Sequence, residues 1–245
     1  MKNFSKLFFL IIFLFSCETE FEERFCPGLR DCVESSDSSF SWRTLFSDNF
    51  NRANSSLRSS SDWNHVEGAP ANGDDFEILT NVAVPKRGAA DPPPSVLYSS
   101  AVTNLAVRVS VTANITGVNF AGAPGDITLL ARTQLGTSID DGYFCGIDPT
   151  TGIVTIGKNV GGAGAPVAVS TANFTIANGD TFSLTFTLSN SSLTCSIVQN
   201  GTLTISATGT DSTYTTGFVG IQGGKSGLGD DELTFDNFLV EAGDP

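Results

Sequence analysis

The stretch "TFSLTFTLS" (residues 181–189) carries the clearest structural pattern in the sequence. Phenylalanine and leucine occupy every second position, and threonine and serine fill the positions between them. Side chains of a β-strand point alternately to two faces, so this period of two places the apolar set on one face and the hydroxyl set on the other. The stretch therefore predicts a half-buried strand of an antiparallel sheet, with one face wet.

The same alternation recurs along most of the chain. It appears in "NLAVRVSVT" (104–112) and "LTCSIV" (193–198), and further strands are expected at 76–84, 126–133, 142–147, 152–158, 202–207, 217–222 and 233–241. Turn sequences separate them, namely "DPTTG" (148–152), "GGAGAP" (161–166), "NGD" (178–180) and "QNG" (199–201). Many short strands without long helical periodicity predict an all-β sandwich or barrel of antiparallel sheets.

The N-terminus has the layout of a signal peptide, expected over residues 1–16. "MKNFSKLFFLIIFLFSC" (1–17) begins with two lysines, continues with an apolar run at 7–15, and ends in Ser16-Cys17. That run is too short to span a bilayer, which needs about 20 helical residues. The ending "LFSC" resembles the relaxed lipobox of spirochaete lipoproteins, which implies lipidation of Cys17. Plain secretion with cleavage elsewhere is the alternative.

Residues 17–44 are expected to form a lipidated tether with a small cysteine loop, followed by one folded domain over 45–245. The tether segment mixes charge and serine with little periodicity. These features predict an exported protein that is held to the membrane of the cell envelope, and to the outer membrane in particular, by an N-terminal lipid such as palmitate. The formal net charge is −13, which excludes nucleic acid as a partner because phosphate backbones attract basic surfaces.

Cysteine usage agrees with export. Once Cys17 is assigned to lipid, Cys26, Cys32, Cys145 and Cys195 remain, and an even number outside the cytoplasm suggests two disulfides. Three pairings are possible. We favour Cys26–Cys32 as a local loop and Cys145–Cys195 as a link between two predicted strands, with free buried thiols as the alternative.

Four longer stretches resemble concanavalin A-like domains of the lectin/glucanase and laminin-G-like superfamily. They are "FSDNFNRANSSL…SDWNHVEG" (46–68), "ITLLARTQ…DGYFCGIDPTTGIVTIGKNVGG" (127–162), the run from "GDTFSLTFTLS" to "GIQGG" (179–224), and "LTFDNFLVEA" (233–242). The resemblance lies in turns and alternation, and it covers about 45–242. It implies an antiparallel jelly-roll β-sandwich. A shared fold does not fix the chemistry.

The tripeptide Asp-Asn-Phe occurs twice, at 48–50 and 236–238. We expect the two copies to lie in the first and last strands, which meet when the sandwich closes. The resemblance implies that Asp48 and Asp236 could ligate one structural calcium there, because hard cations prefer carboxylate and carbonyl oxygens. The alternative is that each carboxylate bonds backbone N–H groups near a strand end or a bulge.

Glycan binding would use aromatic platforms on the surface. Trp63, Tyr98 and Tyr214 are the candidate ligand-binding residues, whereas Tyr143 shares its strand face with Cys145 and is expected in the core.

Catalysis finds little support in the sequence. The resemblance would require a Glu-x-Asp-x-x-Glu strand for glycoside hydrolysis, and none is present. The single histidine, His65, leaves no Ser-His-Asp or Cys-His arrangement to build. The leading interpretation is therefore a non-enzymatic envelope lipoprotein that presents a β-sandwich for glycan or protein ligands. A purely structural envelope component is one alternative, and a glycan-processing enzyme is the other, with loop carboxylates at Asp140, Asp141, Asp230, Asp231 and Glu232.

Overall fold

The stretch at 181–189 forms strand β12 (Thr181–Ser189), and its burial alternates as its sequence predicts. Phe182, Leu184, Phe186 and Leu188 are fully buried, while the serines and threonines between them face solvent. The computed structural model describes residues 41–67, 75–86, 95–117, 125–135, 141–225 and 232–244. Within these ranges, no helix is long and apolar enough to cross a membrane.

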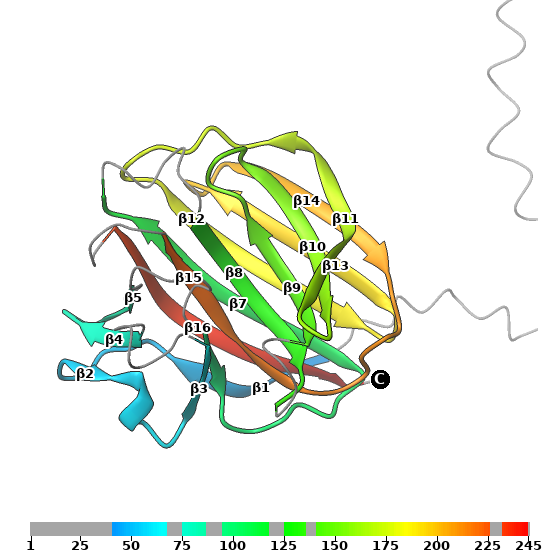
Figure 1. Ribbon diagram of the computed structural model, residues 1–245, viewed down its shortest axis with the longest axis horizontal. Helices are drawn as coiled ribbons and strands as arrows, with labels where there is room; N and C mark the ends of the chain where they lie inside the picture. Colours follow the sequence, from blue (N-terminus) through cyan, green and yellow to red (C-terminus); the bar gives the residue numbers. More distant parts are fainter. Residues whose placement is uncertain are drawn as a thin grey trace, which may run out of the picture. The chain divides into compact units, whose positions relative to one another are not determined.

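The strands form two antiparallel sheets, which confirms the jelly-roll sandwich (Figure 1). In order across the nine-stranded sheet lie β14 (Leu203–Thr210), β13 (Ser192–Gln199), β12, β7 (Ala106–Ile115), β16 (Leu233–Asp244), β5 (Val82–Lys86), β4 (Asp75–Leu79) and β2 (Ser55–Ser56), with β1 (Ser41–Asp48) also paired to β16. In order across the seven-stranded sheet lie β11 (Ala163–Asn173), β10 (Ile153–Val160), β9 (Gly142–Ile147), β8 (Gly125–Thr133), β15 (Phe218–Lys225), β6 (Ser95–Tyr98) and β3 (Trp63–Glu67). A short 3-10 helix, η1 (Leu57–Ser59), follows β2.

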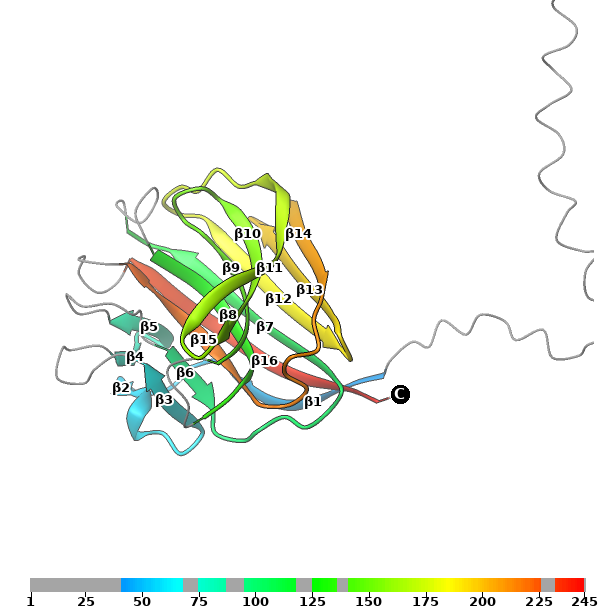
Figure 2. The ribbon, with the colours of Figure 1, turned by 45° about the vertical axis from the view of Figure 1, so that its right-hand side comes forward.

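The core lies between the two sheets and consists of phenylalanine, leucine, isoleucine and valine side chains from both inner faces. Figure 2 shows β8, β9 and β10 stacked over β12 and β13, which is the layer arrangement that buries these faces. A disulfide joins Cys145 of β9 to Cys195 of β13, with both residues fully buried. This bond links one sheet to the other, and it confirms the favoured pairing for these two cysteines. Cys17, Cys26 and Cys32 lie outside the described residues.

The two Asp-Asn-Phe phrases do lie side by side. β1 pairs antiparallel with β16, and Asp48 stands opposite Phe238. Each phrase interrupts regular extended structure, since Phe50 has φ of 53° and Asn237 has φ of 54°. The register of β16 against β7 shifts between Asp236 and Leu239, which marks a bulge. The repeated phrase therefore marks the two places where the paired end strands leave a regular ladder.

Three details differ from the sequence-based expectation. The stretch 76–84 is a hairpin rather than one strand, because Thr80 and Asn81 both adopt positive φ and turn the chain between β4 and β5. In "GGAGAP", Gly161 and Gly162 alone form the turn, and β11 begins at Ala163. Strand β1 already begins at Ser41, before the expected domain start at residue 45.

Candidate functional site

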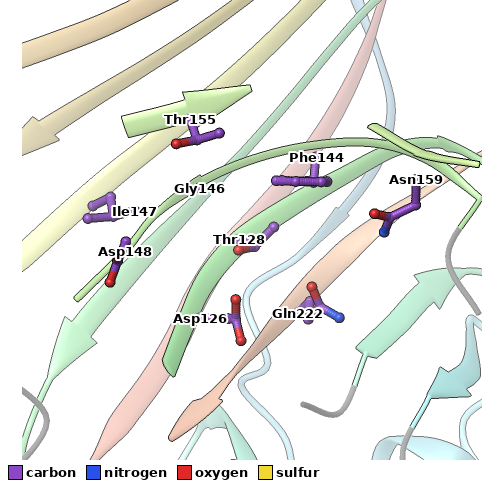
Figure 3. A pocket seen from close by; sticks show the side chains of 9 residues that line it. All are labelled: Asp126, Thr128, Phe144, Gly146, Ile147, Asp148, Thr155, Asn159 and Gln222. Atoms are coloured by element: carbon purple, nitrogen blue, oxygen red, sulfur yellow. The ribbon is translucent and has the colours of Figure 1, made fainter. Parts of the chain in front are cut away.

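An open groove of about 370 Å³ lies on the outer face of the seven-stranded sheet (Figure 3). Four neighbouring strands, β8, β9, β10 and β15, supply its lining. The lining residues are Asp126, Thr128, Phe144, Gly146, Ile147, Asp148, Thr155, Asn159 and Gln222. Two of them are acidic and none is basic.

Strand register places the polar groups of the groove in one row. Thr155 pairs with Gly146, Gly146 with Thr128, and Thr128 with Gln222. Residues opposite each other in neighbouring strands put their side chains on the same face. Gly146, in the middle of this row, has no side chain to fill the groove. A Cβ at this position would stand 2.5 Å from the Thr128 hydroxyl oxygen, so a larger residue would not fit. The Thr155 hydroxyl therefore lies on one side of this glycine, and the Thr128 hydroxyl and the Gln222 amide lie on the other side.

An aromatic ring forms one wall of the groove. Phe144 is half-buried and stands opposite Gly157, one row along the sheet from Gly146. Its ring lies over Gly157 so closely that a Cβ at position 157 would be 2.0 Å from the ring carbon Cζ. Glycine is thus required at 157 for the ring to lie flat on the sheet.

Two carboxylates stand at one end of the groove. Ile127 of β8 pairs with Ile147 of β9, so Asp126 and Asp148 come next at the same end of the two antiparallel strands. The Asp148 carboxylate accepts hydrogen bonds from the Thr150 backbone N–H at 2.8 Å and from the Thr151 hydroxyl at 2.9 Å. These local bonds fix its orientation beside the groove.

The three aromatic residues proposed for ligand binding do not line this groove. Trp63 is 3% exposed and lies in the core, so its ring is not accessible to a ligand. Tyr98 is half-buried and stacks on Phe46, with ring centroids 4.2 Å apart. The structure does not bring these side chains together with Phe144.

Tyr214 belongs to a hydrogen-bonded network that ties the β14–β15 connection to β9 and β10. Its hydroxyl donates to the Asn159 carbonyl at 2.7 Å, and its ring contacts Tyr143 edge-on. Tyr143 is buried, as expected, and its hydroxyl donates to Asp211 at 2.6 Å, while the Lys158 ammonium pairs with the same carboxylate. These bonds give Tyr214 a structural role.

The Asp211 carboxyl has the most strongly shifted acidity in this network. Burial alone raises its pKa, but hydrogen bonds from Lys158, Thr213 and Tyr143 outweigh that effect and hold the pKa well below the ordinary 3.8. For Tyr143, burial raises the pKa, and its hydrogen bond to Asp211 raises it further. At neutral pH the Asp211 carboxylate is therefore ionised and the Tyr143 hydroxyl is protonated, as the hydrogen bond between them requires.

Asp48 does not fit the role of a calcium ligand. Its Oδ1 accepts from the Phe50 backbone N–H and from Arg52, and its Oδ2 accepts from Arg52 and from the Trp63 indole, all within 2.9 Å. Burial alone raises the pKa of Asp48, but these bonds hold it below 3.8. Both oxygens of the Asp48 carboxylate thus accept hydrogen bonds from N–H donors. One of these donors is the Phe50 backbone N–H, which agrees with the alternative that the carboxylate bonds backbone near a strand end.

Asp236 lies apart from those donors. It is half-buried at the β16 bulge, where it accepts from the Asn237 backbone N–H at 2.7 Å. A hollow of about 450 Å³ beside the two phrases is lined by Asn49 and Asn237 but not by Asp236. Across the described ranges, no group of three or more histidine, cysteine or acidic residues could hold a metal ion.

Of the loop carboxylates considered for catalysis, the two that the structure describes, Asp141 and Glu232, do not line the groove. Asp141 is 9% exposed and accepts from the Gly162 backbone N–H, and Glu232 packs against Gly117. Asp140, Asp230 and Asp231 lie outside the described residues, as does the side chain of His65.

The groove residues went unrecognised in the sequence, although one signal was available. Tyr143, Cys145 and Ile147 point inward from β9, so the alternate residue Phe144 must point outward. A phenylalanine out of phase with the buried set of its own strand is a candidate surface platform. The remaining lining residues come from strands that only the sheet register brings together.

Comparison with known proteins supports the fold. No family model and no curated protein sequence matches the chain. Among solved structures, the carbohydrate-binding module CBM66 from Bacillus subtilis matches with a TM-score of 0.55 and 16% identity over 75% of this chain and 98% of the module. A seed lectin of Lotus tetragonolobus matches with a TM-score of 0.57 and 10% identity, covering 82% of this chain and 99% of the lectin.

A third match is to a larger protein. The GH43 protein BlXynB from Bacillus licheniformis gives a TM-score of 0.58 and 12% identity over 80% of this chain, which spans only 39% of that protein. Sequence identities this low show a shared fold and leave function to be argued from the site.

Proposed function

We propose that the chain is a non-catalytic glycan-binding module whose ligand lies in the groove of the seven-stranded sheet. The observation that carries this proposal is the combination of an accessible aromatic ring, Phe144, with carboxylate, amide and hydroxyl groups on one groove. The similarity to carbohydrate-binding modules and lectins gives independent support.

The chemistry of the lining suits a saccharide. Sugar rings have apolar C–H faces that can pack on an aromatic ring, and hydroxyl groups that pair with a few fixed polar groups. In this groove, Phe144 offers the ring, and Asn159, Gln222 and Asp148 offer donors and acceptors. Because its lining contains two carboxylates and no cation, we expect neutral or amino-bearing glycans to bind and acidic glycans to be repelled.

The proposal also includes an anchor. The signal-peptide pattern of 1–16 and the lipobox-like ending support lipidation of Cys17, which would hold the module in the cell envelope through the 17–44 tether. Buried Cys145–Cys195 supports an oxidising compartment. Metabolic labelling with palmitate should mark the wild-type chain and the Cys26→Ala control, and labelling should disappear in Cys17→Ala. Persistent labelling of Cys17→Ala would rule out this anchor.

A glycan array tests the binding function. The full chain is compared with Phe144→Ala and with Ser206→Ala, an exposed position on the opposite sheet. We expect wild type and Ser206→Ala to bind the same neutral or amino glycans, and Phe144→Ala to lose most of that signal. A blank array for the wild type, or equal binding by Phe144→Ala, would count against the proposal.

Glycoside hydrolysis is the second candidate, favoured by the carboxylates Asp126 and Asp148 at one end of the groove. Facing side chains of neighbouring strands bring Cβ atoms to about 5 Å, and retaining glycosidases hold two carboxyl groups about 5–5.5 Å apart. Incubation of array ligands with wild type and Asp126→Asn decides between the two functions. Release of reducing sugar by wild type alone would favour the enzyme.

A further inference from the structure

Exposed apolar side chains gather at one end of the sandwich. The described residues include five exposed large hydrophobic side chains, and three of them lie at this end. Leu105 precedes β7, Leu135 follows β8, and Val160 is the last residue of β10. The Arg132 guanidinium of β8 donates to the Leu105 carbonyl at 2.9 Å, which sets the end of β8 beside the start of β7. Because β8 and β10 both pair antiparallel with β9, they end on the same side, about 10 Å apart.

Leu105, the most exposed of these side chains at 59%, is held by a hydrogen-bonded frame. Its carbonyl accepts from the Asn190 backbone N–H at 3.0 Å as well as from Arg132. The buried Arg132 guanidinium also donates to the carbonyls of Asn190 at 2.8 Å and Tyr214 at 3.0 Å. This frame connects both sheets and presents the leucine to solvent. Apolar side chains gathered on a surface mark a site of contact with a partner or a membrane.

The folded domain also begins at this end. Strand β16 pairs with both β1 and β7, and its end lies between their starts, with Ser41 opposite Asp244 (Figure 1). The next residue, Trp42, is half-buried, and the Arg108 guanidinium lies 4.5 Å from the centre of its indole ring. Tryptophan is favoured where a protein meets the headgroup layer of a bilayer, because its ring is apolar and its N–H is polar. The chain therefore enters the sandwich beside an aromatic and three aliphatic side chains.

We propose that this end of the sandwich, the docking end (Trp42, Leu105, Leu135 and Val160), lies on the lipid surface, with these side chains among the headgroups. The inference depends on the proposed anchor at Cys17, because residues 18–40 then link the lipid directly to the start of β1. A flexible linker of this length holds the domain at an effective concentration on the order of millimolar above the bilayer. A few apolar side chains, too weak to recruit a free protein, are then sufficient to orient a tethered one.

The charges near the docking end favour a neutral bilayer. Arg43 is exposed in β1, Asp211 is paired with Lys158, and Asp141 is only 9% exposed. The protein as a whole carries a net charge of −13, which opposes contact with a strongly anionic surface. The partner that fits is therefore a zwitterionic lipid surface such as phosphatidylcholine.

Docking in this orientation leaves the groove accessible. The groove lies on the outer face of the seven-stranded sheet, along the side of the sandwich. Its carboxylates Asp126 and Asp148 are at the opposite end of β8 and β9 from the docking end. A glycan can therefore enter from the side or from the end that points away from the lipid.

Tryptophan fluorescence of the lipidated full chain on phosphatidylcholine vesicles with brominated acyl chains tests the docking. The chain has two tryptophans, and Trp63 is 3% exposed in the core, so Trp42 is the one that lipid bromine can reach. We expect quenching in the wild type. In Leu105→Asp/Val160→Asp, quenching should fall by about twofold or more, because carboxylates are costly to place among lipids. The matched control is Leu203→Asp, which is 47% exposed at the opposite end of the sandwich and should be quenched as wild type is.

Flotation of the same vesicles separates the anchor from the docking. A wild-type chain that floats without quenching, or equal quenching in Leu105→Asp/Val160→Asp, would overturn the docking and leave the anchor intact. A wild-type chain that does not float would refute the anchor alone. The quenching measurement is then made on Cys17→Ala with a hexahistidine tag in place of residues 1–16, held on vesicles by a nickel-chelating lipid. Quenching there that depends on Leu105 and Val160 supports the docking, and its absence overturns it. None of these readouts depends on glycan binding.

Discussion

The indole Nε1 of Trp63 donates a 2.8 Å hydrogen bond to Asp48 Oδ2, and this buried bond connects the two sheets of the sandwich. Trp63 belongs to β3 of the seven-stranded sheet, and Asp48 ends β1 of the nine-stranded sheet. The same carboxylate pairs with Arg52 and fixes the backbone at Phe50. The first Asp-Asn-Phe phrase is thus a polar anchor within an aromatic cluster.

Replacing this anchor should be costly. In Asp48→Asn, the side chain loses the ion pair with Arg52 and can no longer accept from all four donors. A buried donor left unsatisfied costs roughly 1–3 kcal/mol, so we expect the free energy of unfolding to fall by about 2–3 kcal/mol in urea denaturation. Asp236→Asn is the matched control from the second phrase. It should change stability by less than about 1 kcal/mol, because Asp236 bonds only its neighbour's N–H among the contacts described. Equal losses in both variants would contradict the distinct roles.

The inter-sheet disulfide should contribute more than any single side-chain contact. Cys145 and Cys195 are separated by 50 residues, and closing a loop of that size stabilises a fold by about 4 kcal/mol in the chain-entropy model. We expect the double variant Cys145→Ala/Cys195→Ala to lose about 3–4 kcal/mol of unfolding free energy, measured by thermal or urea denaturation. The comparison variant is Cys26→Ala/Cys32→Ala, whose two positions lie outside the described residues. A wild-type stability in the Cys145→Ala/Cys195→Ala chain would refute this role.

Asp211 should make stability depend on pH. Because its folded pKa is held below 3.8, its ionised form stabilises the fold at pH values above 3.8, and this contribution is lost as the pH falls through the lower folded value. At pH 7 we expect Asp211→Asn to be less stable than wild type by roughly 1–2 kcal/mol. The gap should narrow below pH 3.8 as the wild-type carboxyl is protonated. Exposed Asp62→Asn serves as control, and a gap that is constant with pH would be inconsistent with this explanation.

Gly157 provides a geometric test of the groove. A methyl group at 157 would meet the Phe144 ring at 2.0 Å, so Gly157→Ala must displace that ring while leaving every polar lining residue in place. We expect affinity for the array ligands to fall by about tenfold, equivalent to about 1.4 kcal/mol, as measured by titration calorimetry. Thermal denaturation should show a folded protein. Unchanged affinity would mean that the ring does not contact the ligand.

The fold was largely predictable because strand alternation is a local signal. In 181–189 the parity of four apolar residues fixes the buried face, and the structure buries all four. The hairpin at Thr80-Asn81 was missed because neither residue is glycine or proline, and the apolar alternation continues across the turn. Positive φ at a threonine is decided by the surrounding sheet, which a local pattern does not contain.

The groove was harder to predict for a different reason. Thr128, Gly146, Thr155 and Gln222 become neighbours only through the registers of β8, β9, β10 and β15. The candidate platforms were tryptophan and tyrosine residues, but two of these side chains have structural hydrogen bonds. The Trp63 indole donates to the Asp48 carboxylate, and the Tyr214 hydroxyl donates to the Asn159 carbonyl. Phe144 was identifiable in principle, because its position in the strand places it on the face opposite to that of Tyr143 and Cys145.

Mapping a bound saccharide on the protein tests the central claim most directly. The strongest neutral ligand from the array would be titrated into isotope-labelled protein, and backbone amide shifts followed by NMR. The account predicts saturable shifts centred on Phe144, Gly146 and Gln222, and none on the outer face of β12 and β13. Shifts confined to the nine-stranded sheet or to the loops beside Asp48, with the groove amides unmoved, would contradict it.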